Sequence, residues 1–141
     1  GVPENLRFWI TLFMFISAFG YCFAMYYLIF QDGLDLDFFR GKLNINFMKG
    51  LLIIFLITAA CWIHTTFAYL EHGNQILWTF VQLELWLTGI TVFLMMIGLA
   101  TANGVNNSFL HNASVIGLGI ISFHCLVLDA MLWISRFPIK H

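Results

Sequence analysis

The chain has 141 residues, of which 61% are hydrophobic and only 9% are charged, and its formal net charge is -1. Soluble domains carry about 25% charged residues, so this composition excludes an ordinary water-soluble protein, and the lack of a basic run excludes a surface for nucleic acid. Four apolar segments have the roughly 20 residues that cross the hydrocarbon core of a bilayer, at residues 6–30, 50–70, 76–102 and 113–135. The sequence therefore predicts an all-α integral membrane protein, with residues 1–141 forming a single transmembrane four-helix bundle.

The first segment, residues 6–30, is predicted to be a membrane span of the mature protein. It is too long for a signal peptide, it has only Arg7 as a basic residue near its start, and no small-residue cleavage site follows it. Small residues recur at i, i+3 and i+7 on one helix face, at Ser17, Gly20 and Ala24. Such a helix-packing seam lets helices approach closely. A four-helix bundle needs some seams internally, and we expect this one to serve the docking of a partner membrane protein.

The first loop, residues 31–49, alternates polar and apolar residues on both sides of a basic Arg-Gly-Lys turn at 40–42. This alternation predicts a small β-hairpin that lies on the membrane surface. The loop contains three aspartates, Asp32, Asp35 and Asp37, and oxygen ligands at alternate positions open calcium loops. Because no glycine follows the third aspartate and no glutamate closes the loop, we favour a solvated acidic edge over a calcium site.

The second, third and fourth segments each contribute one ionisable residue to a common layer: His64, Glu84 and Asp129. At a rise of ~1.5 Å per residue, they fall within about 3 Å of the same depth, on the side of the two termini. Acidic groups inside a membrane are costly, and they normally face protein or a water-filled cavity, where they find a partner. The sequence therefore predicts an intramembrane polar layer, in which His64 accepts protons and reaches Glu84 across the short turn between the second and third segments.

Three interpretations of this polar layer remain open. In the first, its contacts tie helices together and contribute about 0.6–2 kcal/mol each. In the second, the layer is part of a proton or cation pathway, as chains of acids and histidines in membranes often are. In the third, two carboxylates and one imidazole bind a metal ion. We favour the first, because a pathway needs polar groups on the far side, and past Thr91 the third segment continues with Leu94, Met95, Met96 and Ile97.

His124 in the fourth segment is a candidate cofactor contact. The second and fourth segments run parallel, and His124 lies about five residues, or ~7.5 Å, deeper than His64. Two imidazoles at such different depths do not suit one haem iron. We therefore expect no cofactor, neither haem nor metal, bound through His64 or His124. His124 is instead interpreted as a hydrogen-bonding residue between helices, or as a contact to a cofactor shared with a partner chain.

The second outer loop contains two triplets that match the N-glycosylation pattern, at Asn106 and Asn112. An asparagine-rich loop also produces such triplets by chance, and Asn112 directly precedes a span. The positive-inside rule does not decide the orientation, because three basic residues lie on each side of the membrane. Tryptophans at the ends of three spans mark the interface on the termini side. We expect the termini to lie in the cytoplasm.

No catalytic motif is present, and the chain is not expected to be an enzyme. Four spans, short tails, a longer first outer loop and a tight inner turn resemble the eukaryotic tetraspan proteins of the MARVEL-like and claudin-like families. Residues 31–49 lack the tryptophan and paired cysteines of claudin-like proteins, so no functional residue carries over. The resemblance implies an accessory, junctional or trafficking role. We predict a non-catalytic accessory or structural subunit of a larger membrane complex, with other membrane proteins and lipid as partners; the alternative is a component of a proton or cation pathway.

Overall fold

The computed structural model of the chain describes residues 4–31 and 33–137. This part of the chain is helical and contains no β-strand, which confirms the predicted all-α fold. Four helical segments in it are long and apolar enough to cross a membrane. They are α1 (Glu4–Phe30), α3 (Ile45–His72), α4 (Gln75–Ala100) and a last segment composed of α5 (Ser108–Phe123), η2 (His124–Trp133) and α6 (Ile134–Arg136).

Polar caps make two of the spans begin earlier than their apolar segments suggest. α3 begins at residue 45 rather than 50, and the side chain of Asn44 accepts a hydrogen bond from the backbone N–H three residues further on. α5 begins at residue 108 rather than 113, with Asn107 in the same role. An asparagine at this position satisfies one of the amide groups that the first helical turn leaves unpaired. Hydropathy therefore located the spans, and the caps set where these two helices begin.

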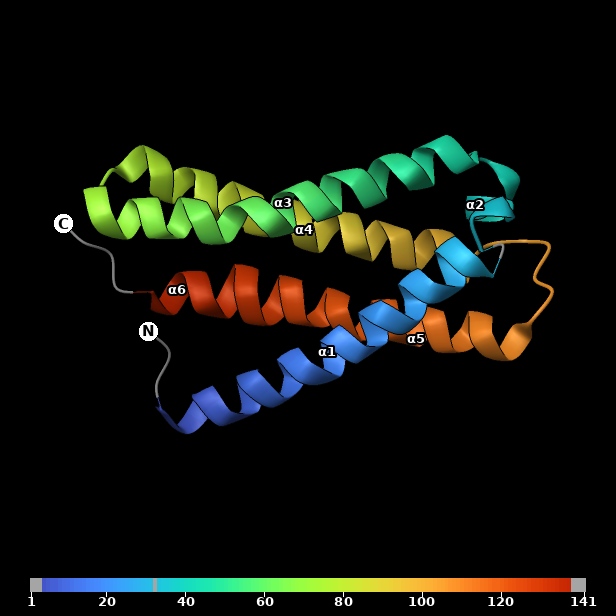
Figure 1. Cartoon of the computed structure of the whole chain (residues 1–141), viewed down its shortest axis with the longest axis horizontal. Coiled ribbons are helices and arrows are strands. Elements are labelled where there is room, and N and C mark those ends of the chain that lie inside the picture. Colours follow the sequence, from blue (N-terminus) through green and yellow to red (C-terminus); the bar gives the residue numbers. More distant parts are fainter. Residues whose placement is uncertain (1–3, 32, 138–141) are drawn as a thin grey trace.

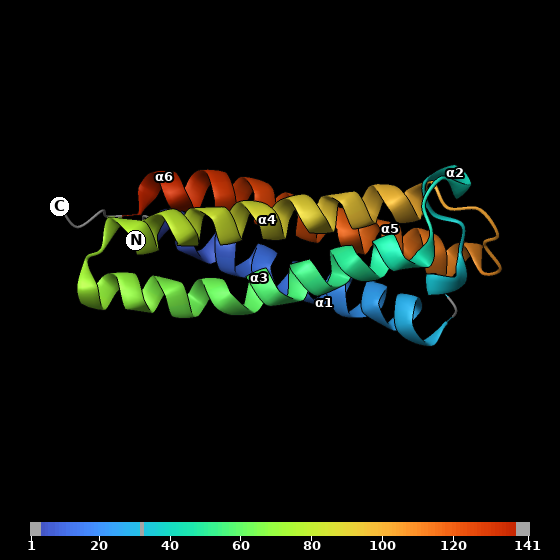
Figure 2. The ribbon, with the colours of Figure 1, turned by 90° about the horizontal axis from the view of Figure 1, so that it is seen from above.

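The long helices run up and down in a bundle, with α4 at its centre (Figure 1). α4 packs against α3, α5 and η2, whereas α1 packs mainly against α5. The start of α1, the turn between α3 and α4, and α6 lie at one end of the bundle, here called the termini end (Figures 1 and 2). The connections from α1 to α3 and from α4 to α5 lie at the opposite end, here called the loop end. This arrangement fits a tetraspan membrane protein.

Two clusters of buried side chains hold the helices together. The larger cluster occupies the loop-end half and draws apolar residues from all four spans. Its large, deeply buried members include Leu28, Phe38, Met48, Met95, Leu99 and Leu118. The smaller cluster lies at the termini end and is rich in aromatic rings. Trp78 stacks on Phe137 with ring centroids 4.9 Å apart, and Trp133 lies within 6.0 Å of Trp78, so these rings join α4 to the end of the last span.

The predicted β-hairpin in the first loop is wrong. The loop contains a 3-10 turn, η1 (Gly33–Asp35), and the short helix α2 (Phe38–Gly41). Phe39 and Arg40 take left-handed backbone conformations, with φ of 52° and 59°, which an extended strand does not allow. The loop also pairs with the connection that follows α4, because Asp37 and Asn103 exchange two backbone hydrogen bonds of 3.3 and 3.0 Å. The alternation over residues 35–38 therefore marks which side chains are buried against the core and not a hairpin.

Candidate functional site

A ladder of polar side chains joins α3 to α4 within the membrane span. Thr65 Oγ1 donates a hydrogen bond of 3.0 Å to Glu84 Oε1. Further towards the loop end, Thr88 Oγ1 donates to Thr58 Oγ1 across 2.8 Å. Hydrogen bonds between spans contribute about 0.6 kcal/mol on average and up to about 1.7 kcal/mol. The ladder therefore holds α3 and α4 in register at two levels of the bilayer.

His64 lies next to this ladder in the sequence but not in space. Its side chain is exposed on α3, whereas the following residue, Thr65, faces Glu84. Successive residues of an α-helix are turned by about 100°, so the face that presents Thr65 to α4 directs His64 outward. Thr65 thus lies against Glu84 in the position predicted for His64.

Asp129 lies beside His124 in η2, the part of the last span that is a π-helix. Asp129 Oδ2 is 3.6 Å from His124 Nε2. The i to i+5 bonding of a π-helix returns residues five apart to one face, whereas in an α-helix they are separated by about 140°. His124 is buried, and the side chain of Asp129 is 28% exposed. The last span therefore carries its own carboxylate–imidazole pair.

The predicted polar layer is divided into two pairs, one between α3 and α4 and one within η2. Three buried polar atoms in the described residues have no hydrogen-bond partner: Ser17 Oγ, Glu84 Oε2 and His124 Nδ1. Within the same residues, no group of three or more histidine, cysteine, aspartate or glutamate side chains is placed to hold a metal ion. Each pair joins an acidic side chain to a hydroxyl or an imidazole, which suits polar contacts between and within the helices.

The small-residue seam of α1 is covered by α5 of the same chain. A Cβ atom added to Gly20 would lie 2.9 Å from the Cα of Gly117, so the two backbones are in direct contact. Ser17 and Ala24 on the same face are buried. At the loop end of this contact, the hydroxyl oxygen of Tyr27 lies 3.4 Å from His111 Nδ1. The expectation that this seam docks a partner is therefore corrected, because its close packing is used inside the bundle.

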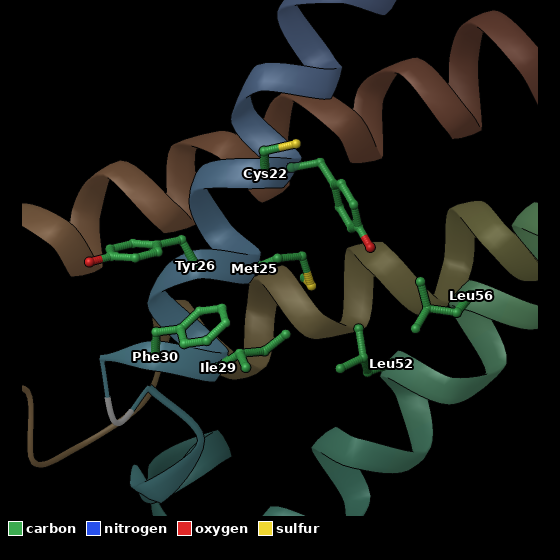
Figure 3. Close-up of a pocket in the computed structure, with 8 residues that line it drawn as sticks. Cys22, Met25, Tyr26, Ile29, Phe30, Leu52 and Leu56 are labelled. Carbon is green, nitrogen blue, oxygen red and sulfur yellow. The ribbon is translucent and has the colours of Figure 1, made fainter.

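An apolar groove of about 320 Å³ opens between α1 and α3 in the loop-end half of the bundle. Figure 3 shows Leu52 and Leu56 extending from α3 towards Met25 on α1. The other lining residues are Tyr21, Cys22, Tyr26, Ile29 and Phe30. None of these lining residues is a carboxylate, a lysine, an arginine or a histidine, so the groove suits hydrocarbon.

The two glycosylation triplets have different surroundings. Asn106 is exposed in the connection between α4 and α5, and Ser108 of the same triplet is exposed at the start of α5. Asn112 is exposed as well, but it lies within α5. Ser114, the third residue of that triplet, is fully buried and donates a hydrogen bond of 2.7 Å to the backbone oxygen of Leu110. Only the first triplet therefore presents both of its recognised residues on the surface.

The polar ladder between α3 and α4 and the contact of His124 with Asp129 were not predicted from the sequence. Thr58 and Thr65 are seven residues apart and share one face of α3, so their spacing was the available indication of the ladder. The contact of His124 with Asp129 had no such indication, since residues five apart point in different directions on an α-helix. The π-helical geometry of η2 alone brings them together.

No protein-family model, curated protein or solved structure matches this chain. The tetraspan architecture is supported by the four long apolar helices. Membership of the MARVEL-like or claudin-like families remains a proposal that rests on this arrangement of spans.

Proposed function

We propose that this chain is a non-catalytic accessory or structural subunit of a larger membrane complex, and that it docks through one face of α1. The observation that carries the proposal is a row of exposed aromatic side chains, here called the aromatic ridge. It consists of Phe8, Phe15, Phe19 and Tyr26, whose exposed fractions are 67%, 58%, 77% and 49%. Their spacing of 7, 4 and 7 residues places all four on one face of the helix.

α1 makes fewer contacts within the chain than the central helix does. In the most apolar 18-residue stretch of α1, only 11% of the residues are buried inside the bundle, against 44% in the corresponding stretch of α4. Figure 1 shows α1 crossing α5 and diverging from α3 and α4 towards its amino-terminal end. Helices associate in lipid through shape-complementary packing rather than through exclusion of water. A continuous ridge of rigid rings on a helix whose most apolar stretch is largely unburied within the chain suits the groove of a neighbouring membrane protein.

The proposal is tested by purifying the chain from its native membrane in mild detergent and measuring the mass of the assembly. A variant with Phe8→Leu, Phe15→Leu and Phe19→Leu keeps the ridge apolar but removes its rings, and we expect co-purifying subunits to be lost. The control replaces three exposed phenylalanines on α3 and α4, with Phe67→Leu, Phe80→Leu and Phe93→Leu. The control should retain the complex.

A monodisperse wild-type monomer would contradict the accessory role, above all if the protein alone passed ions or converted a substrate in liposomes. Equal loss of subunits in the control would show that aromatic content in general, and not the ridge, holds the complex. Circular dichroism of each variant checks that its helical content is kept.

A role in a proton or cation pathway is the second candidate function. Two acidic side chains inside the spans favour it, since Glu84 meets Thr65 and Asp129 lies beside His124. The apolar cluster of the loop-end half stands against it, because Met48, Met95 and the other deeply buried members offer no polar group for a hydrated ion. A pathway through this bundle would require the loop-end half to open.

We also propose that the termini end faces the cytoplasm. The exposed Asn106 triplet at the loop end supports this orientation, because glycosylation takes place on the side of the membrane away from the cytosol. The resemblance to tetraspan proteins suggests an accessory, junctional or trafficking role in that orientation.

A further inference from the structure

The first loop bends back under the end of α4 and is fixed there by backbone hydrogen bonds. The N–H of Arg40 donates to the oxygen of Thr101 across 3.0 Å, and Asp37 exchanges two backbone hydrogen bonds with Asn103, of 3.3 and 3.0 Å. α4, which is long and apolar enough to cross a membrane, ends at Ala100, so the first contact lies just beyond the end of this helix. The loop therefore holds two basic residues at the end of an apolar span.

The backbone that carries these residues is strained. Phe39 and Arg40 both have left-handed φ values, of 52° and 59°, a conformation that is costly for residues other than glycine. Strained residues persist where the surrounding structure over-determines them, and they are concentrated at binding and catalytic sites. Here the ring of Phe39 fills the space above Gly98, where a Cβ atom would lie 2.7 Å from its Cε2. Packing of Phe39 thus imposes the position of Arg40.

A pocket of about 250 Å³ lies between this loop and α4, here called the basic pocket. Its lining residues are Phe39, Arg40, Lys42, Ile97 and Thr101. Arg40 and Lys42 are exposed, whereas the other three are half-buried. The pocket therefore combines a cationic rim with an apolar wall.

The basic and the acidic residues of the first loop line two different pockets. Asp35 and Asp37 line a different pocket, together with Asn44 and Ile45 from the start of α3. No acidic residue lines the basic pocket, so Arg40 and Lys42 present their charge there without a carboxylate among its walls. This separation favours an anionic ligand at the basic pocket.

We propose that the basic pocket binds the phosphate group of an anionic glycerophospholipid. The Arg40 guanidinium suits two phosphate oxygens at once, and the Lys42 ammonium adds a second positive charge. The glycerol and the first methylenes of an acyl chain lie against Ile97 and Phe39. Basic pockets between membrane helices bind anionic lipid headgroups through such charge contacts, and the phosphate contacts proposed here do not depend on which side of the membrane the loop end faces.

The apolar wall distinguishes a lipid from a free anion. Inorganic phosphate is fully hydrated and gains nothing from Ile97 or Phe39, whereas a lipid places hydrocarbon beside them and removes it from water. The depth of the pocket, next to the last turn of α4, is also the depth at which a lipid phosphate lies. This site is independent of the aromatic ridge on α1, so its test does not depend on the proposed accessory role.

The test is native mass spectrometry of the full chain in detergent with equal amounts of phosphatidylglycerol and phosphatidylcholine that carry the same acyl chains. We expect the wild type to retain phosphatidylglycerol preferentially. Arg40→Gln and Lys42→Gln should each lower its retention about fivefold, and the double variant about 25-fold, which corresponds to about 1 kcal/mol for each basic group. Lys49→Gln is the matched control, because Lys49 is exposed near the same end and does not line the pocket.

A second variant tests the pocket without replacing Arg40, whose neutralisation can disturb the strained loop. Ile97→Trp fills the pocket and leaves both charges in place, and it should also abolish the preference for phosphatidylglycerol. Loss of retention in the Lys49→Gln control, equal to that in Arg40→Gln, would overturn the proposal by showing attraction to total charge. Displacement of the lipid by millimolar inorganic phosphate would overturn it in favour of a free-anion site. Unchanged retention in both Ile97→Trp and the double variant would exclude the pocket altogether.

Discussion

Gly20 of α1 lies directly against Gly117 of α5, so closely that a side chain on either residue would meet the backbone of the other. This contact sets the crossing point of the first and last spans. It also explains why α1 contributes aromatic side chains to the outer surface, since the face that carries its small residues is turned inward.

Substitution of Gly20 is therefore expected to destabilise the isolated chain. Gly20→Leu forces α1 and α5 apart, and overpacking of this kind costs about 1–3 kcal/mol. Thermal unfolding in detergent should occur at a lower temperature than for the wild type. Gly50→Ala is the control, because a Cβ atom at Gly50 in α3 meets nothing within 4 Å, and it should not lower the unfolding temperature. An unchanged unfolding temperature for Gly20→Leu would contradict the observed packing.

The contact between Thr65 and Glu84 is expected to couple α3 to α4. A double-mutant cycle with Thr65→Val and Glu84→Met should give a coupling energy of about 0.6 kcal/mol, and at most about 1.7 kcal/mol. The same cycle with His64→Ala in place of Thr65→Val should give no coupling, because His64 is exposed. Reversible unfolding in detergent measures all of these variants. Coupling through His64 instead of Thr65 would show that α3 is rotated about its axis.

Proton flux tests the second candidate function. Wild-type protein in liposomes that contain a pH-sensitive dye should dissipate an imposed pH gradient no faster than empty liposomes, because the largest fully buried side chains in the loop-end half of the bundle are apolar. Asp129→Asn should leave this rate unchanged. Fast dissipation that disappears in Asp129→Asn, at unchanged thermal stability, would instead favour conduction over a structural role for the pair with His124.

Membrane topology follows from the even number of spans. Single cysteines introduced at Asn74 and Ser108, in a variant without the native cysteines, should react with an impermeant reagent from opposite sides of the membrane. If the termini end is cytoplasmic, Asn106→Gln should remove any glycan that the protein carries, and Asn112→Gln should leave it in place because Ser114 is buried. Labelling of both cysteines from one side would show that one of the four predicted spans does not cross the membrane.

The amino-acid sequence by itself determined the number of spans and their approximate positions. Apolar runs of this length have one stable solution in a bilayer, because a helix satisfies its own backbone hydrogen bonds. The sequence also placed Glu84 and Thr88 on one face of a helix, through their spacing of four residues. These features depend on local composition and periodicity, so no tertiary information was needed.

Only the tertiary structure decided which residues meet. The rotation of α3 about its axis turns Thr65 and not His64 towards Glu84. Neighbouring residues lie at nearly the same depth in the membrane, so an estimate of depth from the sequence cannot tell which of the two faces Glu84. The π-helix in the last span brings Asp129 beside His124, and α-helical periodicity cannot indicate it. The position of Arg40 depends on packing between segments far apart in the sequence, where the ring of Phe39 fits over Gly98. Several faces of a uniformly apolar helix can pack against a neighbour, and close packing decides which face does so. This choice depends on the neighbouring helices and cannot be predicted from the sequence of one helix.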